Sequence, residues 1–213
     1  MKKSPLQFAL QSGLTFVEAG HEYRLHDVPA VSVSHVLRLS GLKSPLLLSP
    51  TMTESVLDRG RRFHMTLASL LLSDTGDMVR VDDENVQQTK TALQWASRNR
   101  LVPITCEAPM IATSPMGYLI GGTVDLLGTS RGNNVIVDWK RGMVTPANMI
   151  QMAAYLWLAR SLGYEINRGV VVDCSTGCDY SPNGSAILTW TMLMRTFDAN
   201  ERTLLDWCVS PQQ

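Results

Sequence analysis

The sequence has no excess of charge of either sign. Its 213 residues carry 19 lysines and arginines against 19 aspartates and glutamates, and charged residues make up 18% of the chain. A formal net charge of zero excludes a global positive field that would draw polyanions toward the protein. It does not exclude a local site for a polyanion, because acids clustered in such a site offset basic residues elsewhere on the surface.

Cysteine is also scarce. A chain of this length with four widely spaced cysteines has no disulfide framework, which favours a reducing compartment. Cys174 and Cys178 have the spacing of half a metal or iron–sulfur site, but no second close pair accompanies them. We therefore interpret Cys106, Cys174, Cys178 and Cys208 as free or buried thiols.

Long apolar runs are missing. No segment reaches the length needed to cross a lipid bilayer, so we expect no membrane partner. Met1-Lys2-Lys3 imitates the start of a signal peptide, but polar residues interrupt the SPLQFALQSG that follows it. There is no internal repeat or low-complexity segment. We expect one soluble domain over residues 1–213, located in the cytoplasm.

What the sequence does contain is a succession of helical and strand patterns. They predict an α/β fold, with a mixed central β-sheet flanked by α-helices. We divide it into an N-terminal extension at 1–52, a core at 53–173 and a C-terminal strand and helix at 174–213. In the extension we expect a hairpin over 14–34 with turns at Ala19-Gly20 and Asp27-Val28-Pro29, a helix over 34–42 capped by Ser34, and a loop over 43–52. Further helices are expected over 53–72, 83–99, 146–162 and 194–208. Further strands are expected over 104–111, 117–127, 134–140, 166–173 and 185–191.

Two of the expected strands carry acids among apolar residues. Asp125 lies in the first, and Asp138 and Lys140 lie in the second. A buried carboxylate without a partner is costly, so these acids need an explanation. Because side chains alternate along a strand, Asp138 and Lys140 share one face, and Val137 and Trp139 point into a core on the other.

The pairing of these strands brings the two acids together. If the hairpin closes about Arg131-Gly132, antiparallel counting places Asp125 opposite Asp138. The Cβ atoms of such partners are roughly 5 Å apart, where two like charges destabilise the hairpin unless a positive charge lies between them. A divalent cation is the natural candidate.

A third acid is expected on the same face. If the preceding hairpin closes near Pro115, Glu107 pairs with about Thr123 and lies beside Asp125. A slip of one residue in either register would move these acids to the opposite face. Carboxylate oxygens suit Mg²⁺ or Mn²⁺, which also bind phosphate oxygens and promote hydrolysis at phosphorus. Lys140 beside the metal would orient the attacking water or neutralise developing charge.

At these positions the chain resembles the PD-(D/E)xK nuclease superfamily, and most closely its RecB-like exonuclease branch. The segment VPAVSVSHVLRLSG is also similar to the start of phage nucleases and of the mitochondrial genome maintenance exonucleases, with Ala30 where a serine is usual. The resemblance covers residues 60 to 155. Its elements are Arg59-Gly60-Arg61-Arg62-Phe63-His64, then Glu107, Asp125, Asp138-Trp139-Lys140 and Gln151-Met152-Ala153-Ala154-Tyr155.

This resemblance implies a restriction-endonuclease-like core and a Mg²⁺- or Mn²⁺-dependent nuclease acting on single- or double-stranded DNA. It implies an exonuclease of replication, recombination or repair, in a bacterial or phage-infected cell, which leaves a 5′-phosphate and has a recombination or replication protein as a further partner. Alternatives are a structure-specific endonuclease or nickase and a non-catalytic DNA-binding module. The implied residues are His64, Asp125, Asp138 and the Trp139 carbonyl as metal ligands, Lys140 as the catalytic lysine, Glu107 as a further catalytic acid, and Gln151 and Tyr155 as residues that position DNA or the lysine.

Several of these residues also have a structural interpretation. His64 alone would be an ordinary histidine on a helix face, and Gln151 with Tyr155 would be a surface residue beside a core-edge tyrosine. A plain Asp138–Lys140 salt bridge would leave Asp125 and Glu107 unexplained. The arginines Arg59, Arg61 and Arg62 form either a solvated helix face or contacts to substrate phosphates.

Other residues also have two interpretations. Gly121-Gly122 marks a bulge or a place where a DNA backbone approaches closely. Trp95 is either core or surface, and Trp139 and Trp157 are core. Asp173 and Asp179 are surface or turn residues outside the site.

Overall fold

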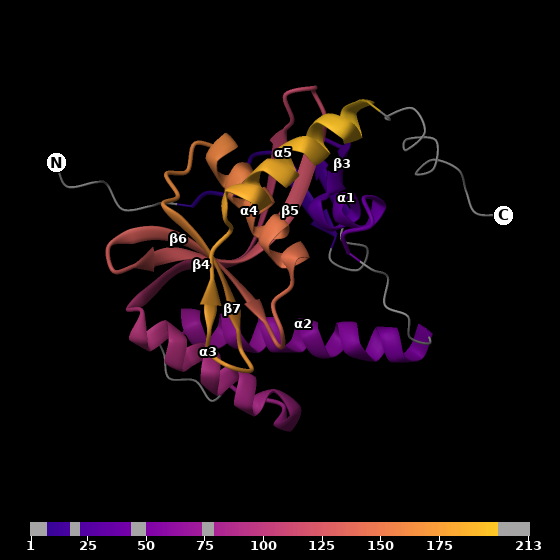
Figure 1. The fold of residues 1–213 in the computed structure, drawn as a ribbon. Helices are drawn as coiled ribbons and strands as arrows, with labels where there is room; N and C mark the ends of the chain where they lie inside the picture. The colour runs from indigo at the N-terminus through magenta and orange to yellow at the C-terminus, as the bar shows by residue number, and fades with distance from the viewer. Residues whose placement is uncertain (1–7, 18–21, 44–49, 74–78, 200–213) are drawn as a thin grey trace.

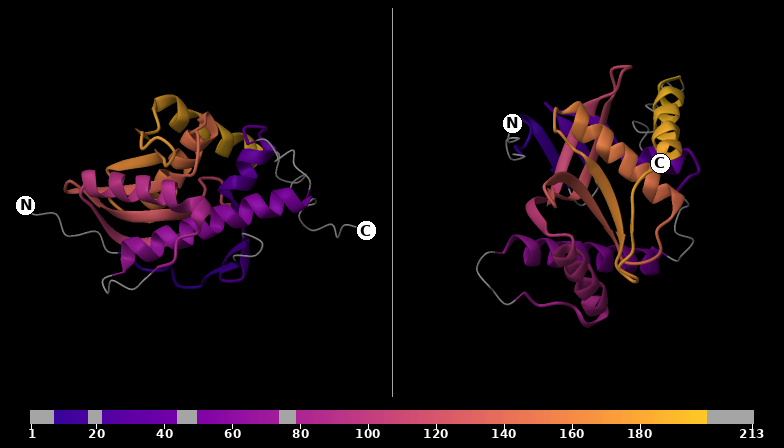
Figure 2. Two further views of the ribbon diagram at one scale, coloured as in Figure 1. Left: turned by 90° about the horizontal axis from the view of Figure 1, so that it is seen from below. Right: turned by 60° about the vertical axis from the view of Figure 1, so that its left-hand side comes forward.

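The computed structural model describes residues 8–17, 22–43, 50–73 and 79–199. An eight-stranded mixed sheet has α2 and α3 on one side and α4 and α5 on the other (Figures 1 and 2). This confirms the predicted α/β class with a central sheet between helices. The strand order is β1-β2-β3-β5-β6-β7-β8, and β4 pairs with β5.

The N-terminal extension is a small meander followed by a short helix. Strands β1 (Leu14–Val17), β2 (Glu22–Leu25) and β3 (Val28–Ser32) are antiparallel neighbours, and β3 then runs parallel to β5. Helix α1 (Val33–Leu39) begins one residue earlier than predicted. Its cap is Ser32, whose Oγ accepts a hydrogen bond from the His35 N–H at 3.1 Å, so the assignment to Ser34 is wrong.

The turns of this extension differ in part from the prediction. Strands β2 and β3 are joined through His26 and Asp27, both with positive φ, and Val28 and Pro29 already belong to β3. The predicted turn at Ala19-Gly20 lies outside the described residues.

Two helices pack on the lower side of the sheet in Figure 1. Helix α2 (Pro50–Leu72) starts three residues before the predicted Thr53, so the end of the predicted loop at 43–52 is helical. The first turn of a helix tolerates a proline, because no backbone N–H donor is required there. A 3₁₀ turn, η2 (Asp83–Asn85), leads into α3 (Val86–Arg98), where one helix was predicted.

The central meander consists of β4 (Leu101–Thr113), β5 (Leu119–Ser130) and β6 (Asn133–Lys140). Strands β5 and β6 pair Ser130 with Asn133 and Leu126 with Val137, which confirms the register predicted about Arg131-Gly132. The predicted partner of Glu107 is wrong, because Thr123 pairs with Pro109. The turn lies further along the chain than Pro115, and a shift of two residues would by itself preserve the face of each side chain.

The ladder between β4 and β5 is interrupted at the two acids. Cys106 pairs with Leu126 and Ala108 with Val124, but no partnership joins Glu107 to Asp125. Glu107 has a φ of 49°, in the left-handed region. Val124 and Leu126 lie two residues apart, yet they pack into the cores on opposite sides of the sheet. The regular alternation of the strands therefore breaks where the acids stand.

The C-terminal part covers the other face of the sheet. Helix α4 (Pro146–Ser161) is followed by β7 (Arg168–Asp173), parallel to β6, and by β8 (Asp179–Tyr180). Helix α5 (Gly184–Ala199) replaces the strand predicted at 185–191 and the break before the helix predicted at 194–208.

The reason for this difference is visible in the packing of α5. Asn183 Oδ1 accepts a hydrogen bond from the Ala186 N–H at 3.0 Å, which supports the first turn of the helix. Ala186, Trp190 and Met194 then recur at helical spacing and are buried in the core shared with α4. The remainder of the predicted C-terminal helix lies outside the described residues. Among the described helices, none is long and apolar enough to cross a membrane.

Candidate metal centre

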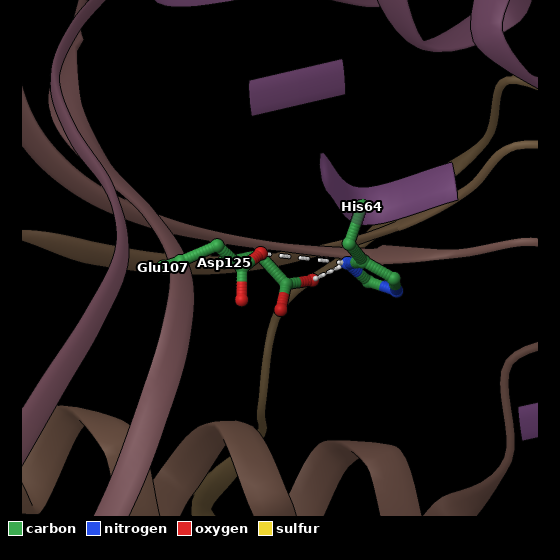
Figure 3. Close-up of side chains that lie close together, drawn as sticks. All are labelled: His64, Glu107 and Asp125. Carbon is green, nitrogen blue, oxygen red and sulfur yellow. Dashed lines mark ion pairs between the residues drawn. The ribbon is translucent and has the colours of Figure 1, made fainter. Parts of the chain in front are cut away.

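Three metal-binding side chains from three different elements meet at one place. His64 comes from α2, Glu107 from β4 and Asp125 from β5 (Figure 3). One potential ligand atom from each lies within 4.8 Å of the others. His64 Nδ1 is 3.1 Å from Asp125 Oδ2 and 4.0 Å from Glu107 Oε1. The predicted convergence of the histidine with these two acids is therefore present in the structure.

Asp125 also bonds to the backbone of the neighbouring strand. Its Oδ2 accepts a hydrogen bond from the Trp139 N–H at 2.7 Å. The N–H and C=O groups of one strand residue point toward the same neighbouring strand, so the Trp139 carbonyl is also directed toward the Asp125 side of β6. This orientation suits the predicted role of that carbonyl as a metal ligand, which remains a prediction.

Asp138 and Lys140 form a pair on β6. Lys140 Nζ is 2.7 Å from Asp138 Oδ2, and Asp138 is only 2% exposed. Val137 and Trp139 are buried in the core on the α2 and α3 side, as the strand alternation predicted. Asp138 is not part of the three-residue group, because its carboxylate is turned to the lysine. Its role as a metal ligand remains a prediction.

Electrostatics distinguish the half-buried Asp125 from the buried Asp138. Burial is the largest influence on both and raises the pKa of a carboxyl group. At Asp125 the charges of His64 and Lys140 outweigh burial, so its pKa is lowered and it remains a carboxylate. At Asp138 burial outweighs the attraction of Lys140, and the negative charge of Asp125 adds to it, so its pKa is raised.

These acids raise the pKa values of the two basic groups of the site. Burial lowers the pKa of Lys140, but Asp138 and then Asp125 more than compensate, so the pKa is raised. Burial also lowers the pKa of His64, and the nearby Asp125 carboxylate reverses this, so the net shift is upward. The Asp125 carboxylate therefore favours positive charge on the groups beside it.

The donor set of this group fits a divalent cation. One imidazole nitrogen and two carboxylate oxygens are ligands that Mn²⁺ accepts, and the carboxylates also suit Mg²⁺. The side chains of His64, Glu107 and Asp125 are 24%, 43% and 13% exposed, so the group opens to solvent on the Glu107 side. A cation held there would keep positions for water and a substrate oxygen.

Gln151 and Tyr155 are buried beneath this site. Both are 6% exposed, and Gln151 Nε2 donates a hydrogen bond to the Tyr155 hydroxyl at 2.7 Å. Burial, followed by the charges of Asp138 and Asp125, raises the pKa of Tyr155 well above its ordinary value. The interpretation of Gln151 as a surface residue is wrong. Both side chains are buried, and the predicted role of the pair in positioning DNA or the lysine remains a prediction.

Aromatic rings occupy the space where side chains would lie at the two neighbouring glycines of β5. A Cβ atom at Gly121 would lie 2.6 Å from Tyr23 Cγ, and one at Gly122 would lie 2.9 Å from Tyr155 Cε1. Both glycines pair regularly with β4, so they do not mark a bulge, and the rings occupy the space expected for a DNA backbone. Tyr23, whose hydroxyl lies 3.0 Å from Thr123 Oγ1, was missed by sequence reasoning because it stands in a distant hairpin.

The arginines of α2 are paired with acids. Arg62 Nε is 2.8 Å from Asp82, its Nη2 is 3.0 Å from Glu84, and it also pairs with Asp58. Arg59 lies 3.4 Å from Glu84, and Arg61 Nη1 lies 3.8 Å from Asp58 Oδ1. The pairs with Asp82 and Glu84 connect α2 to the segment that contains η2, and the pairs with Asp58 lie within α2. Contacts from these arginines to substrate phosphates remain a prediction and would require exchange of these partners.

The remaining residues singled out in the sequence have structural roles. Trp95 is core, packs edge-to-face on Trp139 and donates a hydrogen bond to Asp179 at 2.9 Å. Asp173 is buried and accepts hydrogen bonds from Ser175 in the turn after β7.

The described cysteines are unbonded thiols, as predicted. Cys106, Cys174 and Cys178 are free. Burial, then the nearby acids, raises the pKa of Cys106 and Cys174 to about 12, so neither is available as a thiolate.

No protein-family model and no curated protein matches this sequence. Among solved structures, the fold is similar to SSO0001, with 15% sequence identity and a TM-score of 0.42 over 81% of this chain and 77% of that chain. It is also similar to a protein named "Putative exonuclease" from Eubacterium rectale, with 12% identity and a TM-score of 0.44 over 84% of this chain and 76% of that chain.

Proposed function

We propose that this chain is a Mg²⁺- or Mn²⁺-dependent DNA nuclease of the PD-(D/E)xK superfamily, acting as an exonuclease. The observation that supports this most directly is the meeting of His64, Glu107 and Asp125 beside the Asp138–Lys140 pair. A plain salt bridge on β6 would not require a histidine and two further acids from three other elements. A cation site beside a charged lysine accounts for all five.

The chain's own residues define where the metal would be held. His64, Glu107 and Asp125 would be its primary ligands, with the Trp139 carbonyl directed toward the same region. Once bound, the cation would supply a more acidic water and stabilise negative charge on a phosphodiester. The Trp139 N–H fixes the Asp125 carboxylate, so this ligand is oriented before any metal arrives.

Lys140 is suited to stabilise charge and not to accept a proton. Its raised pKa keeps the ammonium protonated at neutral pH, held 2.7 Å from Asp138. From this position it can donate hydrogen bonds to an attacking water and to a phosphate oxygen, lowering the barrier by electrostatic stabilisation. Asp138 would orient the lysine, in addition to its predicted role as a metal ligand.

The test is cleavage of end-labelled linear DNA and closed circular DNA with Mg²⁺ or Mn²⁺. We expect degradation from the ends of linear DNA and no cutting of circles. Cutting of circles would identify an endonuclease or nickase instead. DNA binding without cleavage would identify a binding module, and the absence of both would refute the proposal.

Matched variants separate catalysis from folding. Asp125→Asn should abolish cleavage, and Lys140→Ala should lower kcat by about 100-fold or more. The controls are Asp27→Asn and Lys90→Ala, which make the same changes at exposed positions away from the site. Equal activity of Asp125→Asn and Asp27→Asn would show that the site has been placed wrongly.

A further inference from the structure

A cleft lined by three arginines lies at the end of the sheet away from the metal centre. Its volume is about 710 Å³, and it is lined by Arg98, Arg100, Val102, Thr129, Arg131 and Gly132. Arg98 ends α3, Arg100 precedes β4, and Arg131 is in the turn between β5 and β6. None of the lining residues is acidic, so the cleft gathers positive charge in a chain whose formal net charge is zero.

The backbone that carries these arginines is held by several hydrogen bonds. Ser130 Oγ donates to the Asn99 carbonyl at 2.8 Å, and Asn99 Nδ2 donates to the Trp95 carbonyl at 3.0 Å. Arg131 Nη2 donates to the Arg98 carbonyl at 3.2 Å. The end of α3 and the β5–β6 turn are thereby fixed against each other, so the cleft is formed before any ligand binds.

These arginines differ from those of α2. Among the described residues, no carboxylate oxygen lies within 4.0 Å of a side-chain nitrogen of Arg98, Arg100 or Arg131. All three side chains belong to exposed residues. Part of their presence has a local explanation, because a basic residue at a helix C-terminus is favoured by the helix dipole. That explanation covers Arg98, whose Nη2 would lie 3.3 Å from a Cβ atom at Gly177, but not the two further arginines, Arg100 and Arg131, that line the same cleft.

We infer that this cleft binds the sugar–phosphate backbone of the nucleic acid whose cleavage is proposed above, and the inference rests on that function. Arginine is the side chain best matched to phosphate, through its planar array of donors. Arg131 follows Asp125 by six residues, five of them in β5, which corresponds to roughly 20 Å. At about 3.4 Å per base pair, the cleft contacts a duplex roughly six base pairs from the bond being cut.

The test compares two variants with the same change in charge. One replaces Arg98, Arg100 and Arg131 with glutamine, and the control replaces Arg24, Arg80 and Arg195, which are exposed elsewhere. Binding of a fluorescein-labelled 20-base-pair DNA duplex is measured by anisotropy in EDTA, which prevents cleavage, at salt concentrations from 50 to 300 mM. For the cleft variant we expect the slope of log Kd against log salt to fall by about 0.9 for each phosphate group that its side chains no longer neutralise.

Each outcome decides the inference. A smaller slope and weaker binding for the cleft variant alone support it, and equal slopes for the two variants overturn it. If the parent cleaves DNA but the two triple variants bind alike, only the cleft is refuted, whereas a parent that neither binds nor cleaves refutes both proposals. Urea unfolding of each variant excludes loss of folding. The single variant Arg100→Gln provides a second measurement, because the Arg100 side chain forms no hydrogen bond within the described part of the chain.

Discussion

The backbone of Glu107 has a conformation that is unfavourable for any residue with a Cβ atom. Its φ of 49° lies in the left-handed region, although the residue stands inside β4. For an L-residue other than glycine this conformation costs roughly 1–2 kcal/mol, because the Cβ atom approaches the following carbonyl oxygen. In ordinary strand backbone the order is reversed, and glycine is less stable than alanine by about 0.5–1 kcal/mol through its entropy in the unfolded chain.

We therefore expect Glu107→Gly to be more stable than Glu107→Ala by about 0.5–1 kcal/mol, which is the conformational cost less the entropy of glycine. Both variants lack the carboxylate, so its loss does not enter the comparison. Thr113 is exposed on the same strand and has no positive φ. At this position the alanine variant should be more stable than the glycine variant by about 0.5–1 kcal/mol. The stability of the glycine variant relative to the alanine variant should thus differ by about 1–2 kcal/mol between positions 107 and 113, with opposite sign.

The assay is urea unfolding of the four variants in EDTA, with stability taken as the free energy of unfolding. If alanine is more stable than glycine at position 107, as at 113, Glu107 does not have a left-handed backbone. That result would also contradict the interruption of the β4–β5 ladder opposite Asp125. If the order reverses only at 107, local strain is stored where the acid is directed into the site.

Three further predictions concern the surroundings of the site. Gly122→Ala should lower the free energy of unfolding by about 1–3 kcal/mol because its Cβ would press on Tyr155. Gly142→Ala should be neutral in the same urea titration, because the added Cβ would meet no described atom beyond the neighbouring residues within 4 Å. Tyr155→Phe should cost about 1–3 kcal/mol by leaving the Gln151 amide without its partner, and a double variant with Gln151→Leu should recover part of that loss. Because the pKa of His64 is raised, protons compete with metal there, so the Mn²⁺ Kd measured by calorimetry should increase as pH falls, and the increase should be smaller in His64→Gln.

The sequence was sufficient to predict how β5 and β6 pair. Turn residues at Arg131-Gly132 and apolar residues on one face together specify one register, and the structure has that register. The alternation also placed Val137 and Trp139 in the core and Lys140 beside Asp138. These predictions depend only on neighbouring residues and on the period of a strand.

Other features depended on information that a local pattern lacks. A left-handed glutamate inside a strand has no signal in the sequence, so the break at Glu107 was not predicted. The segment at 185–191 contains β-branched residues that suit a strand, and its helix is decided by the burial of Ala186 and Trp190 against a distant helix. The glycines of β5 were interpreted without Tyr23, because its contact with Gly121 joins segments far apart in the chain.

The central claim is that His64, Glu107 and Asp125 hold a divalent cation. Isothermal titration calorimetry with Mn²⁺ on the metal-free parent, Asp125→Asn and the control Asp27→Asn tests it directly. We predict saturable binding to the parent and to Asp27→Asn, and loss of that binding in Asp125→Asn. Binding that is equal in all three proteins, or absent from the parent, would contradict the metal centre.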